Sequence, residues 1–262
     1  MKEVITSAQN PKIKEIIRLR KPRERRKENL IIIEGRQEIE LARQAGLEIV
    51  ELFYCQDFAG SKKIAGLSEE IITPVVPAVF EKISYRENPD GFLVLARLKY
   101  LELGKIKLSQ KPLIIILESL EKPGNLGAIL RSADAAGADA VIVADPKTDI
   151  YNPNVIRASL GTVFTNQVAV GGMEEIKSWL KEKKIKSLAA TPEAKKIYTE
   201  VNYTGPVAII MGEEHPGLSK EWLSAASGKI RIPMAGKIDS LNVSVSTAVI
   251  LFEAIRQRSL KI

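Results

Sequence analysis

Short apolar runs alternate with helical patterns along the second half of the chain. We predict strands at Leu113–Leu117, Ala140–Ala144, Gln167–Val170, Lys186–Ala190, Val207–Met211 and Lys229–Ile232. Apolar residues at helical spacing predict helices at Leu126–Ala136, Pro153–Leu160, Glu174–Lys183 and Asn242–Arg256, with a short helix after Ser219. This alternation is typical of an α/β fold whose mostly parallel sheet is covered by helices on both faces.

The first hundred residues predict a separate, smaller α/β unit. Asn10 and Pro11 are typical of a capped helix start, and the apolar residues Ile13, Ile16 and Ile17 follow at helical spacing. The further elements expected here are strands at Leu30–Ile33, Ile49–Tyr54 and Phe92–Ala96 and helices at Arg36–Ala45 and Val79–Ile83. We therefore divide the chain into a domain at residues 1–98, a polar and basic linker at 99–111 and a second domain at 112–262.

Positive charge is concentrated at the amino terminus. The 262-residue chain has a net charge of +7, and its first 27 residues, with ten basic and three acidic side chains, carry that whole excess. Such a segment is either a solvated arm or a contact for a polyanion, and we favour nucleic acid. We expect Arg20–Lys27 to be a basic loop or helix end. The candidate RNA-binding residues are Lys12, Lys14, Arg18, Arg20, Lys21, Arg23, Arg25, Arg26 and Lys27.

Composition excludes several classes of protein. One cysteine (Cys55) and one histidine (His215) exclude a disulfide framework and metal sites rich in cysteine or histidine, and we expect no metal. The apolar runs are too short to span a bilayer and no secretory signal begins the chain, so we expect a soluble cytoplasmic protein without a membrane partner. No P-loop motif occurs, and no glycine-rich dinucleotide fingerprint follows Leu113–Leu117.

Three loops at the ends of predicted strands carry the candidate chemistry. In the first, Pro123 and Gly124 form a turn, Asn125 can cap the next helix, and Arg131 lies nearly two turns further on. The apolar neighbours of Arg131 lead us to expect that it is partly buried. Ligands in α/β proteins bind at such carboxyl ends of strands.

The second and third loops are also rich in glycine and polar residues. The second, Met211–Ser219, places two glycines around adjacent carboxylates. The third, Ile232–Ser244, ends in Ser-Leu-Asn-Val-Ser at the start of an apolar helix, where polar groups are costly unless they are paired. That last helix, Asn242–Arg256, is apolar on more than one face, so it lies either in a deep core or against a second subunit.

Taken in order, the three loops resemble the SpoU/TrmH-type branch of the SPOUT methyltransferases. The matching strings are Asn125-Leu-Gly-Ala-Ile-Leu-Arg131, Gly212-Glu-Glu-His-Pro-Gly217 and Ile232-Pro-Met-Ala-Gly236, the last continuing to Ser240-Leu-Asn-Val-Ser244. The segment Asp149–Gly161 is similar to the family's sequence between the first two motifs. Residues 1–98 resemble, more loosely, a ribosomal-protein-like RNA-binding domain.

The resemblance implies methyl transfer from S-adenosylmethionine to a ribose 2′-hydroxyl of structured RNA. It further implies a deep trefoil knot in the catalytic domain and a homodimer formed through the last helix. The implied donor-binding residues are Gly212, Ile232, Leu241, Thr191, Glu213 and Met234. The implied catalytic residues are Arg131, which activates the hydroxyl, and Asn125, Glu214, Ser240 and Asn242, which hold Arg131 and the ribose. His215 stands where the family usually has a small residue.

Three alternatives remain open from the sequence. Ribosomal RNA is favoured as substrate over transfer RNA, because an additional amino-terminal domain suits a large folded target. A related enzyme could instead methylate a base, although no acid dedicated to a ring nitrogen is evident. A non-catalytic RNA-binding protein could have kept the fold, although Arg131 and Asn242 would then be expected to have been lost.

Overall fold

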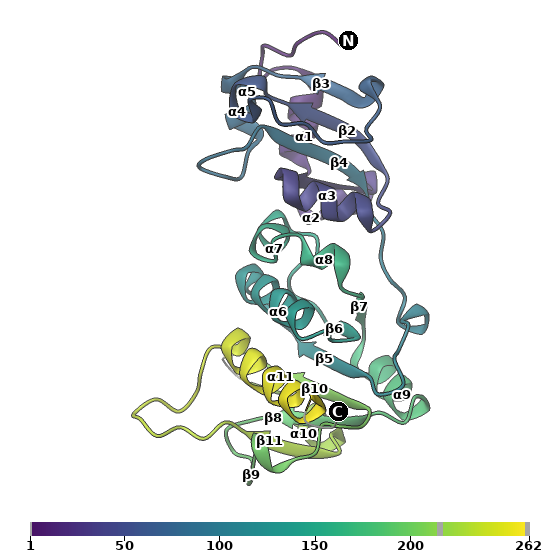
Figure 1. Cartoon of the computed structure of the whole chain (residues 1–262), viewed down its shortest axis with the longest axis vertical. Coiled ribbons are helices and arrows are strands. Elements are labelled where there is room, and N and C mark those ends of the chain that lie inside the picture. Colours follow the sequence, from purple (N-terminus) through teal and green to yellow (C-terminus); the bar gives the residue numbers. More distant parts are fainter. Residues whose placement is uncertain (1, 214–216, 260–262) are drawn as a thin grey trace. The chain divides into compact units, whose positions relative to one another are not determined.

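A computed structural model gives the fold and describes residues 2–213 and 217–259. The chain forms two compact units (Figure 1). The first unit consists of Met1–Lys99 and Asp149–Thr165, and the second of Tyr100–Thr148 and Asn166–Ile262. No helix in the described ranges is both long and apolar enough to cross a bilayer.

The first unit is a four-stranded sheet with helices. Its elements are α1 (Pro11–Arg18), α2 (Pro22–Glu28), β1 (Leu30–Glu34), α3 (Arg36–Gln44), β2 (Ile49–Tyr54), α4 (Gln56–Ala59), β3 (Ile72–Pro74), α5 (Pro77–Ile83), β4 (Phe92–Arg97), α7 (Pro153–Ala158) and α8 (Thr162–Thr165). The strand order is β1-β4-β2-β3, with β4 antiparallel to both of its neighbours. As predicted, Asn10 caps α1, and Ile13 and Ile16 are buried in the core of this unit.

The second unit is built on a seven-stranded sheet. Its elements are β5 (Leu113–Glu118), α6 (Pro123–Ala135), β6 (Ala140–Ala144), β7 (Val168–Gly171), α9 (Met173–Glu182), β8 (Lys186–Ala190), β9 (Lys196–Ile197), β10 (Val207–Met211), α10 (Lys220–Ala225), β11 (Gly228–Arg231) and α11 (Val243–Ser259). The strand order is β7-β6-β5-β10-β8-β11-β9, and every pairing is parallel. The predicted parallel α/β sheet is confirmed, whereas the knot stays a prediction.

Helices cover both faces of this sheet. Apolar residues of α9 and α10, including Trp179 and Trp222, pack with alternate residues of β5, β6 and β10 in one core cluster. Helices α6 and α11 pack against each other (Figure 1). Because β5, β6 and β10 are buried throughout, they are the continuous apolar runs that the sequence shows, as expected for strands covered on both faces.

Three segments differ from the sequence expectation. Arg20–Lys27, expected as a loop or helix end, contains most of α2, a helix that begins at Pro22. The expected linker at 99–111 is partly packed, since Leu103 and Ile106 are buried in the core cluster of the second unit. The segment Asp149–Thr165, expected within the second domain, groups instead with the first unit. The apolar residues of α7 and α8 account for this, because α7 contacts β1 and α8 contacts α3.

Candidate active site

The three candidate loops meet at the carboxyl edge of the seven-stranded sheet. They follow β5, β10 and β11, and a fourth loop, which begins at Thr191, follows β8. In the sheet these strands are ordered β5-β10-β8-β11, and all four run parallel. Their carboxyl ends therefore lie side by side, at the edge where open α/β sheets bind ligands.

A cavity of about 410 Å³ opens at this edge. Its walls combine apolar side chains, such as Ile230 and Ile250, with the backbone of the loops. Ser240 of the third loop lines it as well. All six residues predicted to bind the donor line this one cavity: Thr191, Gly212, Glu213, Ile232, Met234 and Leu241.

Gly212 is required for the shape of the second loop. A Cβ at this position would lie 2.5 Å from the carbonyl carbon of Gly217 and from the backbone nitrogen of Leu218. The backbone of Gly217 and Leu218 therefore lies closer to Gly212 than any side chain would allow. Its far end is fixed by Glu118, at the end of β5, whose carboxylate accepts a hydrogen bond of 2.8 Å from the backbone N–H of Ser219.

The carboxylate of Glu213 lies on the wall of the cavity and faces a lysine that the sequence did not single out. Its side chain is 13% exposed, and Lys147 Nζ lies 3.5 Å from Glu213 Oε2 and 2.6 Å from Glu121 Oε1. The hydrogen bond with Glu121 raises the pKa of Lys147 above its ordinary value, so this lysine stays charged. Through these ion pairs, Lys147 connects the loop after β6 with the loop after β5, which contains Glu121, and the loop after β10, which contains Glu213.

Asn125 and Asn242 join the first and third loops. The side-chain amide of Asn242 donates a hydrogen bond of 3.1 Å to Asn125 Oδ1, and Asn242 Oδ1 accepts 2.9 Å from the backbone N–H of Ser244. Asn242 therefore caps α11. The expectation that Asn125 caps α6 was wrong, because α6 begins at Pro123 and Asn125 lies in its first turn.

Arg131 is exposed on α6, and the expectation of partial burial was wrong. The buried residues of this helix, among them Leu126, Ile129 and Ala133, form a stripe at helical spacing, and Arg131 lies off it. Arg131 is also not among the residues that line the cavity of its own chain. Glu214, a predicted catalytic residue, and His215 lie outside the described residues.

The amino-terminal basic segment is mostly exposed, with two exceptions. Lys12 forms an ion pair with Glu51. Arg25 is fully buried: its Nε lies 3.0 Å from Asp149 Oδ2, and its Nη1 donates to the carbonyl oxygens of Leu19 and Arg20 at 2.8 and 2.9 Å. The prediction that Arg25 binds RNA was therefore wrong, because its guanidinium is buried and already hydrogen-bonded within the protein. The exposed members are Lys14, Arg18, Arg20, Lys21, Arg23, Arg26 and Lys27.

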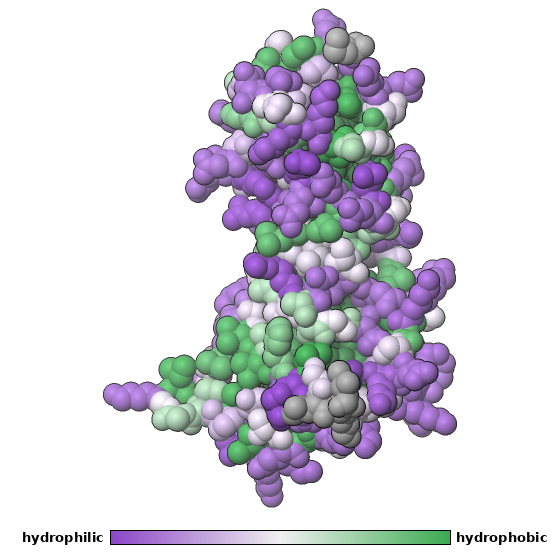
Figure 2. Space-filling model, in the orientation of Figure 1, coloured by the Kyte–Doolittle hydropathy of each residue, from purple (hydrophilic) through white to green (hydrophobic). Residues whose placement is uncertain are grey.

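Apolar side chains reach the surface along α11. Val245 is 48% exposed and Phe252 is 50% exposed, whereas Ile250, Leu251 and Ala254 are buried in the fold. Figure 2 shows hydrophobic residues gathered over this helix.

In the ranges that the structure describes, no group of three histidine, cysteine or acidic residues is placed to hold a metal ion.

Two family profiles match the chain in tandem. Residues 112–252 match the SpoU rRNA Methylase family, and residues 10–94 match an MRM3-like substrate binding domain. The first match spans the loops that form the cavity described above, and the second spans most of the first unit.

Individual proteins are similar over most or nearly all of the chain. An "uncharacterized tRNA/rRNA methyltransferase" of Synechocystis is 28% identical, covering 97% of this chain and 94% of that protein. The 23S rRNA (guanosine-2′-O-)-methyltransferase RlmB of Ralstonia nicotianae is 32% identical, covering 78% and 83% of the respective chains.

Solved structures agree with these matches. The crystal structure of an RNA 2′-O ribose methyltransferase is 44% identical and superposes with a TM-score of 0.84, covering 98% of this chain and all of that one. An AdoMet-bound rRNA methyltransferase from Sinorhizobium meliloti is 31% identical, with a TM-score of 0.87 and 97% of each chain covered.

Proposed function

The chain belongs to the SpoU rRNA Methylase family, and we propose that it transfers a methyl group from S-adenosylmethionine to a ribose 2′-hydroxyl of ribosomal RNA. The observation that carries this proposal is the cavity at the carboxyl edge of the second unit, which gathers all six predicted donor-binding residues from loops far apart in sequence. Relatives that modify 23S rRNA favour ribosomal RNA, and transfer RNA is the second candidate.

The cavity fits a donor with an adenosine and an amino acid part. The apolar residues Ile232 and Leu241 can enclose a flat base, while the backbone of the Gly212 loop offers hydrogen-bonding groups. The carboxylate of Glu213 offers an acceptor on the same wall. S-adenosylmethionine supplies a methyl group on a positively charged sulfur, so no metal is needed for the transfer.

We assign Arg131 an electrostatic role. A guanidinium stays protonated near neutrality and is therefore a poor base. Its positive charge can instead lower the pKa of the 2′-hydroxyl, while a phosphate or a carboxylate accepts the proton. Asn125, Glu214, Ser240 and Asn242 would then position Arg131 and the ribose for in-line attack.

A homodimer formed through α11 is part of the proposal. The exposed Val245 and Phe252 would be buried in it, as expected for an isologous interface. Since Arg131 does not line the cavity of its own chain, the dimer also offers an arrangement in which Arg131 of one copy faces the donor of the other. We place the reaction in the cytoplasm, where the RNA substrate resides.

The first experiment tests the activity. The protein is incubated with methyl-labelled S-adenosylmethionine and separately with bacterial ribosomal RNA and transfer RNA, and the labelled nucleosides are identified after digestion. We expect a 2′-O-methylnucleoside from ribosomal RNA, and loss of the signal in Gly212→Val, whose side chain would overlap the loop backbone. Label on a base would favour a base methyltransferase, and no transfer to any RNA would favour a non-catalytic RNA-binding protein.

A second experiment tests whether Arg131 acts on the partner's donor. Arg131→Ala and Gly212→Val are each expected to be inactive. Mixed dimers would contain one complete site if Arg131 acts across the interface, so subunit exchange should restore up to about a quarter of the wild-type rate for two equally mixed copies. If Arg131 acts within its own chain, mixing restores nothing.

A further inference from the structure

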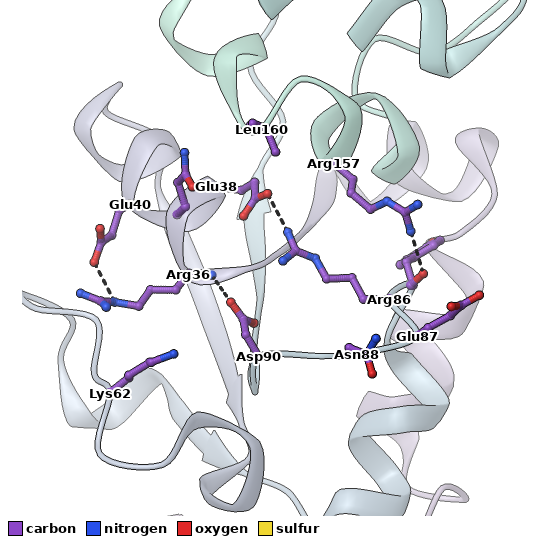
Figure 3. Close-up of a pocket in the computed structure, with 12 residues that line it drawn as sticks. Arg36, Glu38, Glu40, Lys62, Arg86, Glu87, Asn88, Asp90, Arg157 and Leu160 are labelled. Atoms are coloured by element: carbon purple, nitrogen blue, oxygen red, sulfur yellow. Dashed lines mark hydrogen bonds and ion pairs between the residues drawn. The ribbon is translucent and has the colours of Figure 1, made fainter. Parts of the chain in front are cut away.

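The first unit contains a cavity of about 770 Å³ that the proposed chemistry does not use (Figure 3). It is lined by the amino end of α3, by the loop between α5 and β4, and by Lys62. Two residues from the segment around α7, Arg157 and Leu160, complete the lining. The cavity therefore joins the part of the chain that matches a substrate binding domain to a segment that matches the methylase family.

Most of the acidic groups in the cavity are already engaged. Glu38 Oε1 accepts a hydrogen bond of 2.6 Å from the Arg86 guanidinium, and Glu40 lies 3.1 Å from Arg36 Nε. The carboxylate of Asp90 accepts a hydrogen bond of 2.8 Å from the backbone N–H of Arg36. Two of the four lining carboxylates, Glu38 and Glu40, are thus paired with arginines, and the carboxylate of Asp90 is hydrogen-bonded to the backbone (Figure 3).

Two cations keep their charge available to a ligand. Among the described residues, neither Lys62 nor Arg157 has a carboxylate within ion-pair distance, and both side chains are exposed. Arg157 Nη1 donates to the carbonyl oxygen of Tyr85 at 3.4 Å, a contact that orients the guanidinium without neutralising it. Figure 3 shows Lys62 and Arg157 on opposite sides of the cavity. A phosphate is the anion that such a pair is suited to bind.

The remaining lining suits a nucleobase. The amides of Gln37 and Asn88 are exposed, and each offers both a donor and an acceptor for a base edge. Leu160 is 40% exposed at the rim and has a φ of 52°, a backbone conformation that is costly for a leucine. That conformation presents an apolar side chain where a base can pack.

An ion pair between Arg86 and Glu38 forms part of the cavity lining. Gly35, just before α3, has a φ of 105°, and a side chain there would overlap the Arg86 guanidinium and the Glu38 carboxylate. Arg86 also donates to the carbonyl oxygen of Glu34 at 3.2 Å. The pair Arg86–Glu38 is therefore formed by the protein alone, and neither of its two charges is left for a ligand.

We propose that this cavity receives one unpaired nucleotide of the RNA substrate, with Lys62 and Arg157 binding the phosphates on its 5′ and 3′ sides and Gln37 and Asn88 reading its base. The inference rests on the proposed function for the identity of the polymer. Protein recognition of RNA sequence generally uses unstacked bases whose edges are free, and a duplex would not enter a cavity of this kind. The surface therefore selects single-stranded or looped RNA.

The test compares two matched pairs of substitutions. One variant is Lys62→Gln with Arg157→Gln. The control is Lys63→Gln with Arg97→Gln, which removes the same charge at exposed residues of the first unit that do not line the cavity. The probes are a labelled 20-nucleotide single-stranded RNA of random sequence and a blunt RNA duplex of the same length, and binding is measured by fluorescence anisotropy over a range of salt concentrations.

For the single-stranded probe we expect the cavity variant to bind at least tenfold more weakly. The slope of log K against log salt should fall by about 1.4, for two lost phosphate contacts. Duplex binding should change less than twofold, and the control should bind both probes as the wild-type protein does. Equal losses for both probes, equal losses in the control, or no loss in the cavity variant would each overturn the proposal.

A second variant tests the reading of the base. Gln37→Ala with Asn88→Ala should change which sequences are enriched from the random pool while leaving the salt slope unchanged, and an unchanged enrichment would overturn this part. Binding of S-adenosylmethionine, measured by calorimetry, should be the same in all variants, because its proposed site lies in the second unit. Failure of the wild-type protein to methylate any RNA would overturn the proposed function and leave these binding results standing.

Discussion

Arg25 and Arg131 show how differently two arginines are used in this molecule. Arg25 belongs to the most basic stretch of the chain and was expected at the surface, yet it is fully buried. Arg131 lies among apolar residues and was expected to be partly buried, yet it is exposed. The density of charge around an arginine in the sequence therefore says little about its environment in the fold.

The partners of the two side chains explain the contrast. Arg25 meets Asp149, 124 residues further along the chain, and its remaining donors find the carbonyl oxygens that end α1. A buried guanidinium is tolerated only when it is paired and hydrogen-bonded in this way. Arg131 lies outside the stripe of buried residues on α6, so its charged side chain is exposed and can contact a substrate.

The largest effect on activity is expected for Arg131→Ala. Loss of a charge that stabilises a developing oxyanion should lower the rate of methyl transfer by about 100-fold or more. The stability of the protein should change by no more than about 0.5 kcal/mol, because the residue is exposed. Single-turnover transfer and thermal unfolding measure the two quantities. A loss of donor affinity beyond about tenfold (1.4 kcal/mol) would contradict the assigned role.

The opposite outcome is expected for Arg25→Ala. Asp149, whose side chain is 3% exposed, would be left as a buried charge without a partner, at a cost of about 3–5 kcal/mol in the free energy of unfolding. Urea unfolding measures this cost, and Arg26→Ala is the control at an exposed neighbour. The double variant Arg25→Met/Asp149→Leu should recover much of the stability, since it removes both charges. An unchanged unfolding midpoint in Arg25→Ala would show that the pair does not stabilise the fold.

A smaller effect is expected at the exposed basic residues of α2. Neutralising Arg23 and Arg26 should weaken RNA binding and reduce the slope of log K against log salt by about 0.7–0.9 for each phosphate contact that is lost. Filter binding at several salt concentrations provides the measurement. If the slope is unchanged, the first unit contacts RNA through other residues. The exposure of Arg23 and Arg26, in contrast to the burial of Arg25, would then not reflect a role in RNA binding.

The smallest effect concerns Lys12 and the pH dependence of stability. Burial would raise the pKa of Glu51, but hydrogen bonds from Lys12, Thr73 and Lys2 outweigh it and hold this pKa below its ordinary value. The pair therefore stabilises the fold above the pKa that Glu51 has in the unfolded chain, and the contribution is lost as the pH falls through the folded pKa.

Lys12→Gln should accordingly destabilise the protein by less than about 1 kcal/mol at neutral pH, because Lys12 is partly exposed. Its stability should approach that of the wild-type protein as the pH falls through the lowered pKa of Glu51 and the carboxylate becomes protonated. Urea unfolding at a series of pH values from neutral to acid tests this. A difference that stays constant over the whole range would assign the effect to helix packing and not to the ion pair.

Much of the fold follows from local patterns. The strands β6, β8 and β10 begin and end where the sequence predicts. In β6 and β10 every residue is apolar and buried, so the strand bounds follow the apolar run. The three candidate loops could be placed together because parallel strands bring their carboxyl ends to one edge, whereas the donor residues within them came from the family resemblance. The short strand β9 was missed, since two residues carry no periodicity.

The sequence by itself determined the parallel sheet and the loops at its carboxyl edge, because apolar runs and turn residues act close by in the chain. The proposed donor residues came from the resemblance of these loops to a known family. Only the tertiary structure decided that Asp149–Thr165 packs with the first unit, that Arg25 is buried against Asp149, and that Arg157 faces the cavity beside α3. These features depend on contacts between charged and apolar residues that are far apart in the sequence. Local sequence patterns do not predict which distant residues come into contact.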